Sequence, residues 1–68
     1  MINTALNTEI EKVYTVSEIA ELLKLHPVTV RRFIRAKKIN AVKMGKDWRV
    51  YESDLVKYYD TYLKPVTN

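Results

Sequence analysis

The feature that most constrains this chain is Pro27, which lies inside a stretch of apolar residues with helical spacing. The stretch covers residues 16–33, where apolar side chains recur on one face of a helical pattern. A proline disfavours helical geometry at the preceding residue, here His26, so one continuous helix cannot span the stretch. Pro27 itself suits the first turn of a helix. The stretch therefore predicts two short helices that are separated just before Pro27.

The ends of these two helices can be placed from the residues around them. Thr15 and Glu18 fit a capping box, in which each side chain satisfies a free backbone N–H of the other residue, so the first helix opens at Thr15. It must end near Lys24, and the second helix is expected to run from about Pro27 to Ala36. Two short helices joined by about three residues predict a helix-turn-helix. Their expected inner residues are Ile19, Leu22 and Leu23, then Val30, Phe33 and Ile34.

A β-hairpin is expected after the second helix. Two β-prone runs, at residues 39–44 and 48–51, flank a turn formed by residues 45–47. Gly45 is the only glycine in the chain, and it lies where a positive φ is most useful. The chain is therefore predicted to be mainly α-helical with a small β-hairpin.

A third helix and the domain boundaries follow from the remaining residues. Ser53 and Asp54 can start a helix, which cannot continue normally past Lys64 because Pro65 follows. We expect one domain at residues 13–64, preceded by a flexible arm (1–12) and followed by a short tail (65–68). Tyr58, Tyr59 and Tyr62 cannot all point inward, so only part of that set is expected in the core.

Positive charge is concentrated in one part of the chain. Residues 24–49 carry a net charge of +8 with Asp47 as their one acid, whereas the rest of the chain carries −4. A basic face on a fold that can enter a groove points to a polyanion, and duplex DNA is the first candidate. The nine basic residues of the segment are Lys24, Arg31, Arg32, Arg35, Lys37, Lys38, Lys43, Lys46 and Arg49.

Other functional classes find little support in the sequence. The chain has no cysteine, and its single histidine, His26, cannot form a metal site alone. No glycine-rich phosphate loop and no nucleophile–base pattern occurs. No apolar run approaches the roughly 20 residues of a membrane span, and the first residues lack a signal-peptide pattern. We therefore expect no enzyme, no cofactor, no metal and no membrane association.

Residues 14–63, about three quarters of the chain, resemble a known family. The matching text, which begins YTVSEIAELLKLHPVTVRRFIRAKKINAVKMGKDWRVYESDL, is similar to the winged helix-turn-helix domains of phage and transposon excisionases, which are related to MerR-like regulators. Ala20 occupies the small-residue position at the helix crossing. The resemblance implies a winged helix-turn-helix fold in a cytoplasmic, nucleoid-associated bacterial protein that binds duplex DNA. It places Ile19, Leu23, Leu25, Val30 and Phe33 at buried positions.

Two departures from the family pattern concern the backbone. Family members often have glycine in the turn after the first helix, where this chain has Lys24 or Leu25. They often have glycine just after the second helix, where this chain has Lys37. If those positions need a left-handed backbone, lysine carries modest strain there.

The second helix is the expected recognition helix, because a helix fits the major groove and its N-terminal residues usually reach the base edges. His26 is expected as a cap or a phosphate contact. Arginine can contact guanine at two points, while threonine and valine can touch a thymine methyl. The alternative is that the arginines form only a solvated face. The residues expected to point outward are His26, Pro27, Val28, Thr29, Arg31, Arg32 and Arg35.

The hairpin is the expected wing. Trp48 has two interpretations: it packs the hairpin against the helices, or it lies along the sugar–phosphate backbone. The resemblance implies that Arg49, which follows this aromatic residue, makes a backbone or minor-groove contact, flanked by Lys43 and Lys46. The negative charge of Asp47 disfavours a contact with phosphate, so we expect this residue to cap the turn.

The resemblance also implies a role. The chain is predicted to be an excisionase-like architectural factor, or recombination directionality factor, of a mobile element. It would act with an integrase, as several neighbouring copies bound cooperatively on DNA. A small transcriptional regulator of the same fold is the alternative, and a protein-interaction adaptor is the less favoured one.

Overall fold

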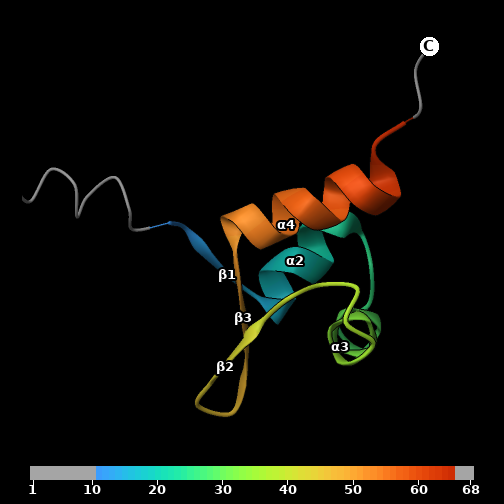
Figure 1. The fold of residues 1–68 in the computed structure, drawn as a ribbon. Coiled ribbons are helices and arrows are strands. Elements are labelled where there is room, and N and C mark those ends of the chain that lie inside the picture. Colours follow the sequence, from blue (N-terminus) through green and yellow to red (C-terminus); the bar gives the residue numbers. More distant parts are fainter. Residues whose placement is uncertain (1–10, 66–68) are drawn as a thin grey trace, which may run out of the picture.

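The computed structural model describes residues 11–65, in which helices pack against a small antiparallel sheet (Figure 1). This architecture confirms the predicted winged helix-turn-helix. The elements in chain order are β1 (Val13–Thr15), α2 (Val16–Leu23), α3 (Pro27–Arg35), β2 (Val42–Met44), β3 (Asp47–Tyr51), α4 (Glu52–Tyr58) and the π-helical turn η1 (Tyr59–Leu63).

The predicted capping box opens α2. The Thr15 backbone N–H donates to Glu18 Oε1 at 2.9 Å, and the Glu18 backbone N–H donates to Thr15 Oγ1 at 3.0 Å. Ile19 and Ala20 are buried, as expected. The expectation for Leu22 was wrong, because its side chain is 58% exposed. The buried stripe of α2 runs through residues 16, 19, 20 and 23, and Leu22 lies off that stripe on the solvent side.

Both helices of the helix-turn-helix end in the same way. Lys24 after α2 has φ of 60°, and Lys37 after α3 has φ of 67°. The next N–H in each case, from Leu25 and Lys38, donates back to Ala20 O at 2.8 Å and Phe33 O at 2.9 Å. These are Schellman motifs, in which a left-handed residue reverses the chain. The two lysines therefore occupy the glycine positions that the resemblance identified.

The sheet has one strand more than the predicted hairpin. Its order is β1-β3-β2, with both pairs antiparallel. In the first pair Tyr14 lies opposite Val50, and in the second Lys43 lies opposite Trp48. The central strand β3 thus joins the wing to the residues that precede α2. The sequence did not indicate β1, because three residues directly before a helix cap are too few for a period-2 pattern.

The hairpin turn is formed by Gly45 and Lys46, since Met44 already pairs with Asp47. The predicted turn at residues 45–47 was one residue too long, because Asp47 already belongs to β3. Gly45 has φ of +60°, which confirms its expected backbone role. Glycine at the first central position with a positive φ is characteristic of two-residue hairpin turns.

Residues before β1 hold the start of α4. Glu11 accepts two hydrogen bonds from Ser53, and the Glu52 N–H donates to Lys12 O at 2.9 Å. α4 begins at Glu52, slightly earlier than expected, and the helical turn η1 ends at Leu63, before Pro65. Glu11 and Lys12, which the sequence analysis assigned to the arm, are therefore attached to the domain. The rest of that arm, residues 1–10, lies outside the described residues, as do residues 66–68 of the expected tail.

The core lies where the sheet, α2, α3 and α4 meet. Of the three tyrosines Tyr58, Tyr59 and Tyr62, only Tyr58 is buried, at 6% exposed, which confirms that only part of the set belongs to the core. Leu23, Leu25 and Phe33 are half-buried against this core. The buried core residues are Val16, Ile19, Ala20, Val30, Ile34, Ile39, Val50 and Tyr58.

Candidate nucleic-acid interface

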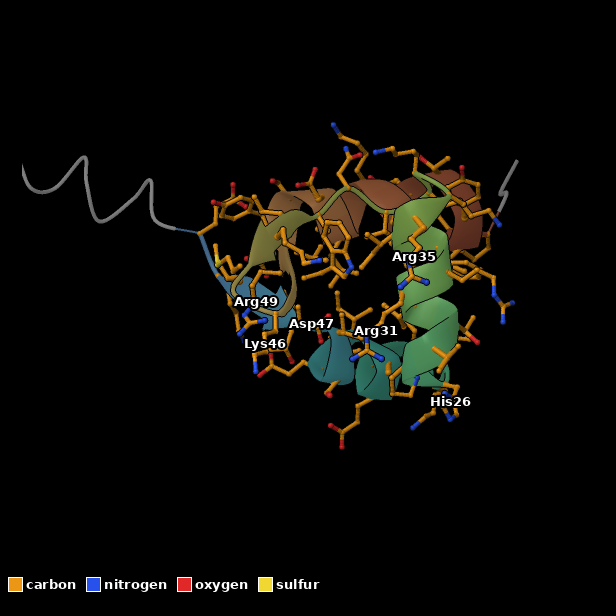
Figure 2. The ribbon with its side chains drawn as sticks, turned by 90° about the horizontal axis from the view of Figure 1, so that it is seen from below. His26, Arg31, Arg35, Lys46, Asp47 and Arg49 are labelled. Atoms are coloured by element: carbon orange, nitrogen blue, oxygen red, sulfur yellow. The ribbon has the colours of Figure 1, made fainter. Side chains whose placement is uncertain are left out.

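The recognition helix and the tip of the wing lie on one side of the molecule. In Figure 1, α4 lies along the top, whereas α3 and the β2–β3 turn lie at the bottom. Figure 2 views the protein from that lower side and shows His26, Arg31 and Arg35 on α3, with Lys46, Asp47 and Arg49 on the hairpin. A helix and a hairpin that project to the same side can contact a groove and the adjacent backbone together.

The N-terminus of α3 is capped by His26. Its Nδ1 accepts a hydrogen bond from the Val28 N–H at 3.1 Å, which confirms the capping interpretation. Pro27 occupies the first turn, as expected. Val28 is 53% exposed, but Pro27 and Thr29 are half-buried, so the prediction that all of these residues point freely outward was too broad.

Arg31 differs most from its expectation. Its guanidinium does not extend freely into solvent but donates to the Asp47 carboxylate, from Nη2 at 2.9 Å and from Nε at 3.4 Å. The side chains of Arg31 and Asp47 are 35% and 34% exposed. In Figure 2 the two side chains face each other across the space between α3 and the hairpin. Asp47 turns Arg31 toward the wing because it is the opposite charge within reach of this helix position.

Arg32 and Arg35 remain exposed on α3, as predicted. Arg35 also lines an open cleft of about 460 Å³ between the end of α3 and the wing. Its lining combines the apolar residues Ile34, Ile39 and Ala41 with the polar groups of Lys37 and Asn40. The cleft reaches Trp48 and lies between the two elements expected to contact DNA.

The wing residues divide into exposed and packed ones. Lys43 and Lys46 are exposed, and Lys43 Nζ lies 4.8 Å from the centroid of the Trp48 ring. Trp48 is half-buried against the core, which favours its packing interpretation. Arg49 is also half-buried, and its Nη1 donates to Trp48 O at 3.1 Å. Lys46 at the tip is therefore the most freely placed wing cation, and Arg49 is a partly anchored one.

The electrostatics of the interface centre on Asp47. The hydrogen bond from Arg31 holds the pKa of this carboxyl below its ordinary value, helped by the Trp48 backbone N–H, which donates to Oδ1 at 2.8 Å, and by the charges of Arg31 and Arg49. The same hydrogen bond raises the pKa of Arg31. Asp47 accepts the Trp48 N–H within β3 rather than capping the turn at residues 45 and 46 as predicted, and the contact with Arg31 was missed. The signal for it was a lone acid in a strongly basic segment, and its partner could not be chosen among several arginines.

No cluster of His, Cys, Asp or Glu within residues 11–65 could hold a metal ion. In the same part of the chain, no helix has both the length and the apolar character needed to cross a membrane.

A capped helix, a hairpin wing and a shared basic side together define a helix-turn-helix protein of the DNA-binding class. A family model described as "Helix-turn-helix domain" matches residues 13–61, so the chain belongs to this family. Comparisons with curated proteins and with solved structures gave no significant match.

Proposed function

We propose that the protein binds duplex DNA with α3 in the major groove and the β2–β3 wing on the neighbouring sugar–phosphate backbone. The observation that carries this proposal is the placement of both basic elements on one side, joined by the Arg31–Asp47 ion pair. The exposed Val28, Arg32 and Arg35 would face the groove, and Lys43, Lys46 and Arg49 would contact phosphates. His26 supports this contact indirectly, by capping the helix.

We further propose that the protein is an excisionase-like architectural factor of a mobile element, a recombination directionality factor that carries out no chemistry itself. Support comes from the resemblance of residues 14–63 to excisionases and from membership in a family that contains excisionase-like members. In this role it would bind near the attachment sites of the element in a bacterial cell and help to bend DNA, so that an integrase assembles for excision.

Neighbouring copies would strengthen such binding. A single DNA-binding module buries only about 600–1,000 Å² of protein surface, which is little for choosing a site in a genome. Weak contacts between adjacent copies would add to the affinity of each. Charge supports this arrangement, because Glu52 and Asp54 lie in the first turn of α4, whereas the wing is basic.

The test is footprinting on the DNA that flanks the gene, with and without the neighbouring recombinase, together with band shifts on one, two or three sites. The proposal expects protection at the element's ends, cooperative filling of adjacent sites and recombinase-dependent excision. Protection confined to a promoter, without an effect on excision, would indicate the transcriptional regulator instead. If variants with Arg31 and Arg32 substituted are retained on DNA as strongly as the wild type, a protein-interaction adaptor is favoured.

A further inference from the structure

Asp47 is an unusual residue to find on this face. It is the one acid among residues 24–49, and an acid at a DNA-facing surface opposes the approach of phosphate. Its hydrogen bond to the Trp48 backbone N–H does not by itself require a carboxylate, since asparagine or serine can accept the same bond. Its second contact, the ion pair with Arg31, connects the wing to the recognition helix. This ion pair is the only one formed within residues 11–65.

The way in which Asp47 holds Arg31 leaves a specific part of the guanidinium free. Asp47 accepts from Nε and from Nη2, which together form one edge of the planar group. Arginine has five N–H donors in a fixed fork, so the Nη1–Nη2 edge keeps its own pair of donors. That edge can contact two acceptors at once, and guanine presents such a pair, O6 and N7, in the major groove. The partial exposure of Arg31 leaves room for this contact.

We propose that Asp47 is a positioning residue that fixes Arg31 for an end-on contact with one guanine. The inference rests on the proposed binding of α3 in the major groove. Asp47 is itself held, because its Oδ1 accepts the Trp48 backbone N–H at 2.8 Å and Trp48 packs against the core. A long flexible side chain that is ordered before binding loses less entropy when it binds. Because the wing holds Asp47 and Asp47 holds Arg31, the guanidinium is already ordered when it contacts a base.

The same ion pair acts against random DNA. An unpaired arginine can swing to any nearby phosphate, a contact that carries no sequence information. Arg31 is withheld from that contact by Asp47, and its charge is neutralised locally. Asp47 therefore strengthens the choice of sequence while it weakens general affinity. Substitution of a residue that only stabilised the fold would not lower the sequence preference while raising the affinity for random DNA.

The experiment selects sites from a pool of duplexes with a randomised segment, using the wild type, Arg31→Ala, Asp47→Asn and the control Asp60→Asn. Asp47→Asn keeps an oxygen for the Trp48 N–H, and Asp60→Asn makes the same charge change at an exposed residue of η1. The wild type and Asp60→Asn should enrich guanine at one position, where Arg31→Ala and Asp47→Asn both lose it. The ratio of affinities for the selected and a scrambled duplex should fall about 3- to 10-fold in Asp47→Asn, the factor expected for ordering one flexible side chain.

A second measurement uses the scrambled duplex alone. Asp47→Asn should bind it more tightly than Asp60→Asn does, with a log–log salt slope that is steeper by about one, because Arg31 becomes available to phosphate. In the Arg31→Ala background, adding Asp47→Asn should leave the base preference unchanged. If Asp47→Asn does not fold, Asp47→Ser replaces it: serine can accept the Trp48 N–H but cannot form the ion pair with Arg31, so this variant should lose the guanine preference in the same way.

Other outcomes would overturn the inference. If Asp47→Asn keeps the guanine preference and the affinity ratio, Asp47 does not position Arg31, although DNA binding stands. If Asp47→Asn binds the selected and the scrambled duplex more tightly by the same factor, Asp47 only repels phosphate and does not position Arg31. If the wild type enriches no sequence and binds no duplex, the proposed function itself fails.

Discussion

Glu11 caps α4 from a distant part of the chain, accepting the Ser53 backbone N–H at 2.9 Å and the Ser53 hydroxyl at 3.2 Å. The N-cap residue of that helix, Tyr51, makes no side-chain hydrogen bond to it. A carboxylate at a helix N-terminus satisfies a free N–H and complements the helix dipole. We therefore expect Glu11→Ala to lower the free energy of unfolding by about 1 kcal/mol, measured by urea denaturation.

A matched control for this prediction is Glu21→Ala, which removes an exposed side chain of α2 that makes no capping hydrogen bond. It should change the free energy of unfolding by less than about 0.5 kcal/mol. Equal effects of the two substitutions would show that Glu11 does not stabilise α4.

The left-handed lysines provide a second prediction, on stability. A residue with a Cβ costs about 1–2 kcal/mol in this conformation, and glycine offsets part of the gain through its larger unfolded-state entropy. Lys37→Gly should therefore raise the free energy of unfolding by about 0.5 kcal/mol. The neighbouring Lys38, whose φ is not positive, is the control, and Lys38→Gly should destabilise the protein. Stabilisation by both glycines alike would contradict the strain argument.

A third prediction concerns ionic strength. If about four to six of the lysines and arginines contact phosphate, the log–log dependence of affinity on salt should have a slope of about −4 to −5. Titration of a labelled duplex at several salt concentrations measures it. A slope near zero would rule out the proposed phosphate contacts.

The helix and the wing should differ in what they contribute to binding. Arg32→Ala should weaken binding to the selected duplex by about 1–3 kcal/mol more than to random duplex, if Arg32 contacts a base. Arg49→Ala should weaken binding to all sequences alike, because a wing cation contacts the backbone. Competition assays with both duplexes separate the two effects. A change of base preference in Arg49→Ala without loss of affinity would reverse the assignment of the wing.

The Arg31–Asp47 pair predicts a pH dependence. The pKa of Asp47 is lowered in the folded protein, so its contribution to stability is complete above the ordinary pKa of an aspartate, about 4, and is lost as pH falls through the lower folded value. Near neutral pH the contribution of this pair is therefore fully present, and it should not change with pH. Carboxyl NMR titration should place the Asp47 midpoint below the ordinary value of an aspartate, and Arg31→Ala should raise it. An unchanged midpoint in Arg31→Ala would show that the pair does not form in solution.

Local signals predicted most of this fold. The Thr15–Glu18 capping box and Pro27 placed two helices, and Gly45 placed the hairpin, because each depends on neighbours in the sequence. The remaining features depend on residues far apart. Glu11 finds Ser53, and Arg31 finds Asp47, only after the chain has folded.

The candidate interface was likewise predicted only where local sequence signals determine it. The basic segment indicated a candidate binding side, and the helical spacing indicated α3. Which arginine the wing would hold was undetermined, because Arg31, Arg32 and Arg35 look alike in the sequence. Leu22 was misplaced because its apolar character fits either side of the buried stripe, and only packing decides.

The pairing of β1 with β3 has a consequence for how the chain folds. It brings Val13 opposite Tyr51, so it closes a loop that contains the whole helix-turn-helix and the hairpin. Contacts between distant residues form at a higher entropic cost than the local contacts of α2 and α3. We therefore expect the two helices to dock early and β1 to join the sheet in the last step. An experimental fragment that began after Thr15 would keep every proposed DNA contact but would lack the strand that completes folding.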